Sequence, residues 1–218
     1  MRILCILTVL VGCLEPAVAQ RVLGMSHARP WPADRYADTD GTPWLFDRWL
    51  PAIIYDGAGA TYVVDSLNLN GLTPAVEVRK DGRYIELDER AYPRIQVVRA
   101  PADTVELRAL ALPSGQVRYL LLRYAGSRLQ LFEEFLVSRD ERRIETPGKT
   151  EYIRRFVHRQ RYWLVRPGEA PVLLKSKKKE LLAQLGPAAE LAAFAKKEKL
   201  NPKKVDDLVR LVAFAERL

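Results

Sequence analysis

Apolar and polar residues alternate with a period of two along most of the chain before residue 176. This period is typical of β-strands that bury one face and expose the other. The clearest stretch is Thr61–Val98, in which short polar turns separate four alternating runs. Asn70-Gly71 is the strongest short hairpin signal, because both central residues of a type I′ turn need positive φ. Asp81-Gly82 carries the same signal. The four expected strands are Tyr62–Leu69, Ala75–Arg79, Arg83–Leu87 and Arg94–Val98.

Similar runs lie on both sides of this stretch. The further expected strands are Ala52–Tyr55, Thr104–Ala111, Val117–Tyr124, Arg128–Ser138, Tyr152–Val165 and Pro171–Lys175. The segment Arg139–Lys149 is polar and contains Pro147-Gly148, so we expect a loop there. Together these runs predict about ten antiparallel strands.

The pattern changes to a helical spacing after residue 175. We expect a first helix capped by Ser176, a second from Pro187 to about Lys199, and a third capped by Asn201. The predicted fold class is therefore α+β. An antiparallel β-meander over residues 20–175, forming a large sheet or a partly closed barrel, precedes a small C-terminal helical segment over 176–218. We expect these helices to be packed on the sheet or appended to it.

Residues 1–19 resemble an export signal. A single charge, Arg2, precedes a short apolar run, and the sequence Ala17-Val18-Ala19 favours cleavage before Gln20. Leu10–Cys13 also resembles a lipoprotein box, in which Cys13 would be lipidated, and both readings predict export to the periplasm, outer membrane or medium. The mature chain has no cysteine, so it has neither a disulfide nor a thiol nucleophile.

The formal net charge of +8 is unevenly distributed. Residues 20–138 hold 14 basic and 15 acidic side chains, whereas residues 139–218 hold 20 and 11. In an exported protein, a basic C-terminal part favours an anionic lipid or glycan surface as partner rather than nucleic acid. A solvated basic surface without a partner is the simpler interpretation. We expect no transmembrane helix, because no apolar run reaches the roughly 20 residues needed.

Two groups of residues are candidate ligand-binding sites. Trp44, Phe46 and Trp49 lie close together between prolines, and they predict either a plug at one end of the sheet or a recognition surface for a sugar or lipid. In an unbroken strand over 152–165, alternation places four further side chains on one face. These are Arg155, Arg159, Arg161 and Trp163. Such a face suits an anionic ring or headgroup, or simply water.

The segment from Gly41 to Asn70 resembles a family of exported, uncharacterised Bacteroidota proteins. The likeness rests on a Gly-x-Pro-aromatic-Leu-x-Asp-x-aromatic opening, a glycine-rich turn, an Asn-rich run and a lysine-rich helical C-terminus. The matching opening residues are Gly41, Pro43, Trp44, Leu45, Asp47 and Trp49. This chain departs from the family at its end, where Ala213–Glu216 replaces aromatic and Asn residues. The resemblance implies export and supplies no catalytic residues.

The chain lacks the phosphate-binding, serine-hydrolase and zinc-protease motifs. With His27 and His158 as the only histidines and no cysteine in the mature chain, we predict no metal and no cofactor. The sequence favours a non-enzymatic envelope protein with a binding or scaffolding role. A β-barrel that binds a small ligand or lipid is the alternative. A carboxylate-dependent hydrolase stays open as a third hypothesis, because sequence does not show which carboxylates converge.

Overall fold

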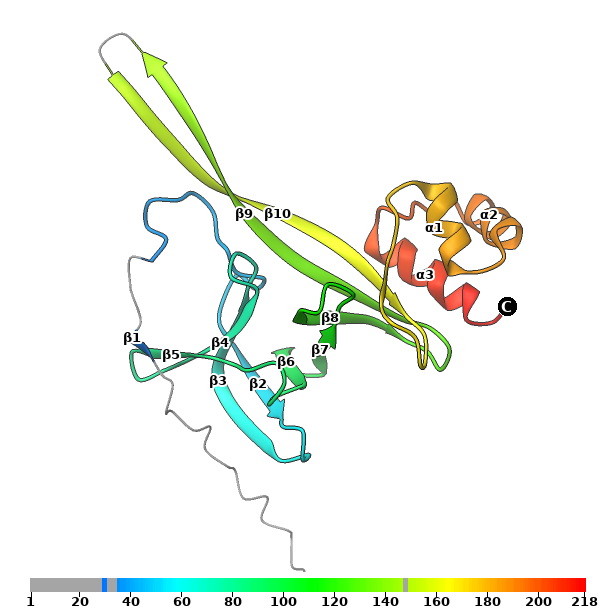
Figure 1. Ribbon diagram of the computed structural model, residues 1–218, viewed down its shortest axis with the longest axis horizontal. Helices are drawn as coiled ribbons and strands as arrows, with labels where there is room; N and C mark the ends of the chain where they lie inside the picture. The colour runs from blue at the N-terminus through cyan, green and yellow to red at the C-terminus, as the bar shows by residue number, and fades with distance from the viewer. Residues whose placement is uncertain (1–28, 31–34, 147–148) are drawn as a thin grey trace, which may run out of the picture.

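The computed structural model describes residues 29–30, 35–146 and 149–218, which form one large antiparallel sheet followed by three short helices (Figure 1). The α+β prediction is therefore confirmed. The expected signal over residues 1–19, its cleavage before Gln20 and the alternative lipidation of Cys13 all lie outside the described residues. No helix in the described part of the chain is long and apolar enough to cross a membrane.

Eleven strands form the sheet. They are β1 (Arg29–Pro30), β2 (Leu50–Tyr55), β3 (Thr61–Asn70), β4 (Ala75–Lys80), β5 (Arg83–Glu86), β6 (Arg94–Ala100), β7 (Asp103–Ala111), β8 (Val117–Ala125), β9 (Gln130–Thr146), β10 (Lys149–Val165) and β11 (Val172–Leu173). Their order across the sheet is β1-β5-β4-β3-β2-β6-β7-β8-β9-β10-β11, and the two outer strands do not meet. The sheet is therefore open.

Most neighbours in the sheet are also neighbours in sequence, as a meander requires. One expected pairing differs, because β6, the fourth strand of Thr61–Val98, pairs with β2 and not with β5; β4, β3 and β2 lie between the two. The connection from β5 to β6 supplies Leu87 and Tyr92 to the sheet's core. Burying these two apolar side chains stabilises the longer connection.

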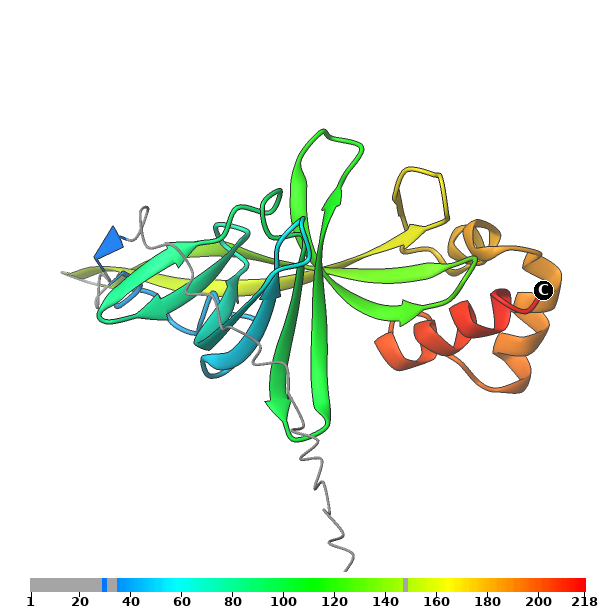
Figure 2. The same cartoon turned by 90° about the horizontal axis from the view of Figure 1, so that it is seen from below.

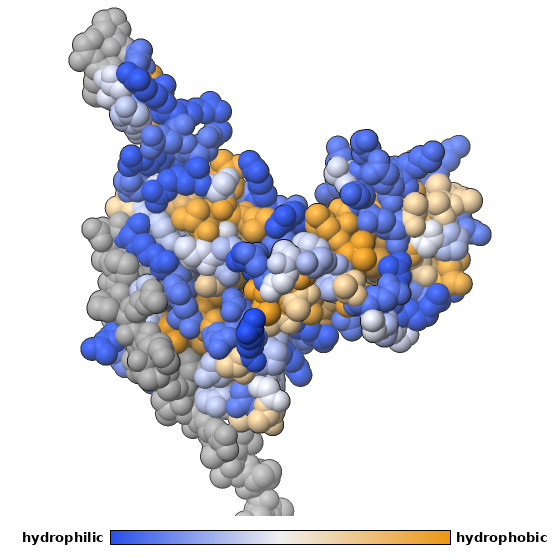
Figure 3. Space-filling view, viewed as in Figure 1, coloured by the Kyte–Doolittle hydropathy of each residue, from blue (hydrophilic) through white to orange (hydrophobic). Residues whose placement is uncertain are grey.

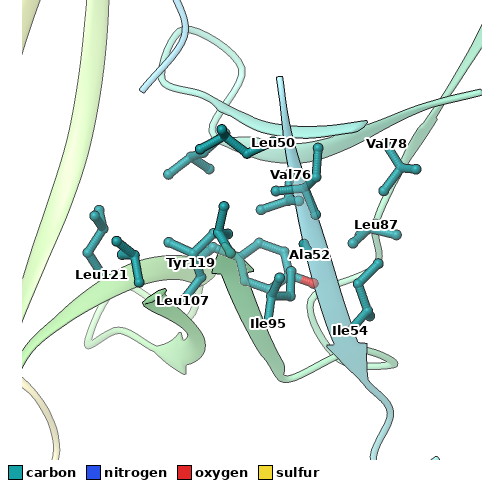
Figure 4. Packing of buried hydrophobic residues seen from close by; sticks show 14 of the residues in the cluster. Leu50, Ala52, Ile54, Val76, Val78, Leu87, Ile95, Leu107, Tyr119 and Leu121 are labelled. Carbon is teal, nitrogen blue, oxygen red and sulfur yellow. The ribbon is translucent and has the colours of Figure 1, made fainter. Parts of the chain in front are cut away.

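The sheet curls around a core on its concave side (Figure 4). Inward-facing residues of β2, β6 and β7, such as Ile54, Ile95 and Leu107, are fully buried there. Tyr119 of β8 also enters this core and donates its hydroxyl to the carbonyl of Tyr92 over 2.8 Å. The curl also brings the turn after β3 against β9, where the amide of Val137 donates to the carbonyl of Gly71 over 2.9 Å.

The turn at Asn70-Gly71 is not the expected type I′ turn. Neither residue has a positive φ, and the connection from β3 to β4 spans residues 71–74. Gly71 is needed for close packing instead, because a Cβ atom there would lie 2.6 Å from Val137 Cγ2 and 2.7 Å from Phe135 Cε1. At the other expected hairpin turn, Asp81 and Gly82 both have the positive φ that a type I′ turn needs, with values of 51° and 67°.

The loop expected over residues 139–149 is wrong for residues 139–146 and 149, which are strand, and Pro147-Gly148 lies outside the described residues. β9 and β10 are 17 residues each and pair in register along their whole length. The charges that suggested a loop face each other across the hairpin. Glu141 lies opposite Arg154 and Asp140 opposite Arg155, and both pairs are joined by hydrogen bonds. Opposite charges in directly facing positions stabilise a ribbon of two strands.

The helices α1 (Lys178–Leu185), α2 (Ala188–Lys197) and α3 (Val205–Ala215) pack against one end of this hairpin (Figure 2). Leu129, Leu131 and Leu164 of the hairpin region share a buried cluster with the helices. The helix starts were predicted too early. Neither Ser176 nor Asn201 is an N-cap, and Lys177 and Lys204 occupy those positions without a side-chain cap.

Glu216 at the end of α3 fastens the helices to the turn between β8 and β9. Its carboxylate accepts hydrogen bonds from the amides of Arg128 and Leu129 and from the hydroxyl of Ser127, at 2.7–2.9 Å. These bonds favour the charged form, and they hold the pKa of Glu216 below its usual value.

Substituting Gly71 by alanine tests the close approach of the β3–β4 turn to β9. We expect Gly71→Ala to lower the free energy of unfolding by about 1–3 kcal/mol, because its methyl group overlaps buried side chains. Chemical denaturation measures the change. Gly57→Ala is the matched control, since no atom lies within 4 Å of its new Cβ; it should stay within about 0.5 kcal/mol of the wild type. Equal losses in both variants would contradict this packing.

Candidate functional site

The aromatic run lies beside the end of β3, where the amide of Leu45 donates to the carbonyl of Leu69 over 2.9 Å and the amide of Gly71 donates to the carbonyl of Pro43 over 2.8 Å. We call residues 39–49 the strap. Asn68 of β3 is almost completely buried beneath it and bonds three backbone groups of the strap. Its Oδ1 accepts from the amide of Phe46 over 3.1 Å, and its Nδ2 donates to the carbonyls of Phe46 and Arg48 over 2.9 and 3.3 Å. The aromatic and Asn-rich segments that carry the family resemblance therefore contact each other.

The three aromatic residues of the strap are half-buried, with different surroundings. Phe46 packs against the core of the sheet. Trp44 and Trp49 contact each other with ring centroids 5.0 Å apart, and the guanidinium of Arg79 lies 5.3 Å from the Trp49 ring. Phe46 thus contributes to a plug, whereas the two tryptophans form an outer aromatic pair. Whether that pair recognises a ligand stays a prediction.

A buried polar network lies beside the strap. Glu77 of β4 is fully buried and accepts two hydrogen bonds from Arg35, at 2.9 and 3.1 Å, and one from Asn70 at 3.1 Å. Burial raises the pKa of Glu77, while the bonds from Asn70 and Arg35 oppose this shift. Both carboxylate oxygens of Glu77 are therefore bonded to protein groups, and the network anchors Arg35, which precedes the strap.

The four predicted residues of β10 share one face, as the alternation indicated. They are not equally available to a ligand. Trp163 is buried and donates its indole N–H to Glu134 over 2.8 Å. Arg161 bonds the other oxygen of Glu134, and Arg155 bonds Asp140 at 3.4 Å. Arg159 is exposed and forms no ion pair with the described residues. The structure does not gather these side chains into one pocket.

Glu133 and Glu134 face opposite sides of β9, because successive side chains alternate along a strand, and both are buried. Glu133 accepts a hydrogen bond from Arg123 over 2.8 Å, and its other oxygen, Oε1, has no partner in the described residues. Glu133 lies on the same face as Leu131 and Phe135, between the helix cluster and the sheet core. It is therefore a charged residue at the junction of two apolar clusters.

The described residues offer little to a hydrolase. His158 is exposed, and its Nε2 donates to the carbonyl of Thr42 over 2.6 Å rather than to a carboxylate. A shallow groove of about 290 Å³ contains the adjacent carboxylates Asp88 and Glu89 together with two arginines. Neither carboxylate is buried, whereas a glycosidase acid needs an apolar environment.

The helices carry a small apolar groove of about 330 Å³ between α1 and α2. Leu182, Ala188 and Ala192 line it, and Lys178 and Lys179 stand beside them. The expected contact between this basic part of the chain and an anionic lipid or glycan surface stays a prediction.

The most unusual surface is the far end of the long hairpin. We call residues 139–145 of β9 and 150–155 of β10 the arm. It projects beyond the rest of the sheet and is mostly hydrophilic (Figures 1 and 3). Three large apolar residues of the arm, Ile144, Tyr152 and Ile153, are 40%, 57% and 41% exposed. None of them belongs to the three buried apolar clusters of the described residues.

Along the arm, the two outer edges of the hairpin differ in their backbone partners among the described residues. β8 pairs with β9 only as far as Glu133, and Val137 makes the last bond to the turn at Gly71. On the other side, Asp40 of the strap bonds β10 at Arg154 and Phe156, at 2.9 and 3.0 Å. Within the described part of the chain, no strand pairs with the outer edge of β9 from residue 139 onwards.

Comparison with known proteins does not supply a function. No protein-family model matches the chain, and no curated protein or solved structure is significantly similar to it. The site must therefore be argued from its own geometry.

Replacing Asn68 tests whether one amide holds the strap. We expect Asn68→Ala to lower the free energy of unfolding by about 2 kcal/mol, because three buried backbone groups lose a partner. Tryptophan emission should shift to longer wavelength as Trp44 and Trp49 become more hydrated. Gln160→Ala removes an exposed amide from β10 and serves as control. Unchanged stability and emission in Asn68→Ala would show that the strap is held by other contacts.

Proposed function

We propose that this chain is an exported, non-enzymatic protein of the bacterial cell envelope that acts as a scaffold. Export is supported by the sequence of residues 1–19 and by the resemblance to exported Bacteroidota proteins. The scaffolding role is supported by one observation above the others. The arm extends two paired strands away from both apolar clusters and leaves the outer edge of β9 open.

An isolated arm of two strands adds little stability to the fold, so its length is best explained by the binding of a partner. A two-stranded hairpin is at best marginally stable in water, and strands in globular proteins are usually about five or six residues long. Here both strands are 17 residues long, and residues 139–145 extend roughly 20 Å at about 3.3 Å per residue. Open strand edges also template pairing with other chains. An added strand would bond these backbone groups, which is the geometry of β-augmentation.

The other surfaces support a binding role less directly. The carboxylates in the buried networks are bonded mainly to arginines of the same chain. The concave side of the sheet is filled by its own apolar side chains. In the arm, by contrast, polar backbone groups and large apolar side chains are presented together on a rigid base. The arm is therefore the element we assign to partner binding.

Site-specific crosslinking in the native organism tests this role. A photo-reactive amino acid at Tyr152 in the arm should give discrete crosslinked protein products in the envelope fraction. The same group at Val63, which is 49% exposed on β3, is the matched control and should give none. No product at Tyr152, or the same products at both positions, would contradict the proposal.

A shortened arm separates binding from folding. Joining Arg142 to Ile153 through Asn-Gly removes residues 143–152 and closes the hairpin at a facing pair whose backbone groups point toward each other, as a two-residue turn requires. This variant should unfold at nearly the same temperature as the wild type, because neither apolar cluster includes the deleted residues. Global unfolding of this variant would mean that the arm is structural.

A further inference from the structure

The outer edge of β9 carries an alternating row of charges. Backbone groups of odd-numbered residues in β9 face away from β10, as the bond from Val137 to Gly71 shows. The odd-numbered residues of the arm also share one face of the ribbon, since side chains alternate along a strand. In order, they are Arg139, Glu141, Arg143 and Glu145. All four are exposed, so the row is accessible.

We propose that this edge pairs with the same edge of a second copy of the chain, antiparallel and centred on Arg142. The inference rests on the proposed function of the arm and names its partner. In this register Arg139 faces Glu145 of the second copy, and Glu141 faces Arg143. The two-fold symmetry repeats both contacts, so that the whole row is matched by opposite charges. A symmetric interface of this kind is self-complementary by construction.

Charge selects this register over its neighbours. Two antiparallel edges form hydrogen bonds only where an odd-numbered residue of one β9 faces an odd-numbered residue of the other. The centre of the pairing can therefore shift along β9 only by whole residues. Moving it by one residue, to Glu141 or Arg143, places like charges opposite each other along the row. Like charges directly opposite destabilise strand pairing, whereas opposite charges stabilise it. Centring on Arg142 also uses all four charged residues of the row.

The backbone can complete its hydrogen bonding in the same arrangement. Each facing pair of outward residues exchanges two N–H to C=O bonds, which gives about eight bonds over the four pairs. The result is a four-stranded sheet in the order β10-β9-β9-β10. The one unfavourable contact brings two Arg142 side chains together on the opposite face. Asp140 lies 3.8 Å from each of them and offsets part of this repulsion.

A second copy fits this edge better than a partner of uniform charge. An acidic or basic strand would match only half of the row and would oppose the other half. The outer edge of β10 is less suited, because Asp40 already bonds it at Arg154 and Phe156. The edge of β9 therefore combines open backbone groups with a charge pattern that is complementary to itself.

Sedimentation velocity of the purified protein, as a function of concentration, tests the pairing. We expect a monomer–dimer equilibrium that weakens with salt. The double variant Glu141→Arg, Glu145→Arg makes the row entirely basic, and Arg139→Glu, Arg143→Glu makes it entirely acidic. Each alone should dimerise at least roughly tenfold more weakly, because four facing pairs become like-charged. Mixing the two variants should restore a dimer that contains one copy of each.

The mixture also serves as the folding control, because only folded arms can pair. Proline substitutions give a second test, since proline removes an N–H group. Arg143→Pro removes an outward N–H of β9 and should abolish the dimer, whereas Thr150→Pro in β10 should leave it intact. A monomeric wild type at every concentration, or a mixture that stays monomeric, would overturn the inference. Crosslinking from Tyr152 to a different protein would then still support the scaffold role, whereas no crosslinking would remove both.

Discussion

The structure depends on the continuous pairing of β9 with β10. The same face of this hairpin supplies Phe135 and Val137 to the core of the curled sheet and Leu131 and Leu164 to the helix cluster. The helices meet the sheet through Leu131 and Leu164 of this hairpin and through β8, which lies against α3. Because a one-residue slip would turn every side chain to the other face, both clusters constrain one register. The arm continues that register beyond the reach of either cluster.

Buried charges mark the places where separate parts of the chain are joined. Glu77 bonds Arg35 next to the strap, Glu134 bonds Arg161 and Trp163, and Glu133 lies between the two apolar clusters. Such pairs add little net stability, because desolvation of both charges offsets their attraction. Breaking one pair, however, leaves a buried charge without compensation. These networks therefore favour one arrangement of strap, sheet and helices over other compact arrangements.

The sequence predicted the strands and helices well wherever one face is buried. Alternation located nearly every long strand, and Asp81-Gly82 identified its turn, because both signals depend on local geometry. The type I′ turn predicted at Asn70-Gly71 is wrong, because Gly71 allows the close approach of Phe135, which is distant in sequence. The loop predicted for the polar segment after Ser138 is wrong because contacts between distant residues again decide the structure. Its stability as a strand comes from charges facing each other across the hairpin, and a pattern of burial does not contain that information.

The candidate site was harder to predict than the fold. Sequence placed Arg155, Arg159, Arg161 and Trp163 on one face correctly, but it could not show that the carboxylates of Glu134 and Asp140 accept hydrogen bonds from three of them. The arm itself was missed, because its β9 side, residues 139–145, lies in the segment expected to be a loop. The available signal was the alternation of sign at every second residue, Arg139, Glu141, Arg143 and Glu145, which share one face only if the segment is a strand.

Residue-resolved hydrogen exchange on dilute protein tests this account most directly. The even-numbered amides of the arm in β9, at Asp140, Arg142 and Ile144, bond to β10 and should be protected. The odd-numbered amides from Arg139 to Glu145 face outward and should exchange quickly while the protein is monomeric. Slow exchange at Val137, which bonds to Gly71, provides an internal reference. Uniformly fast exchange across residues 139–145 would show that the segment is a loop and would remove the basis for partner binding by the arm.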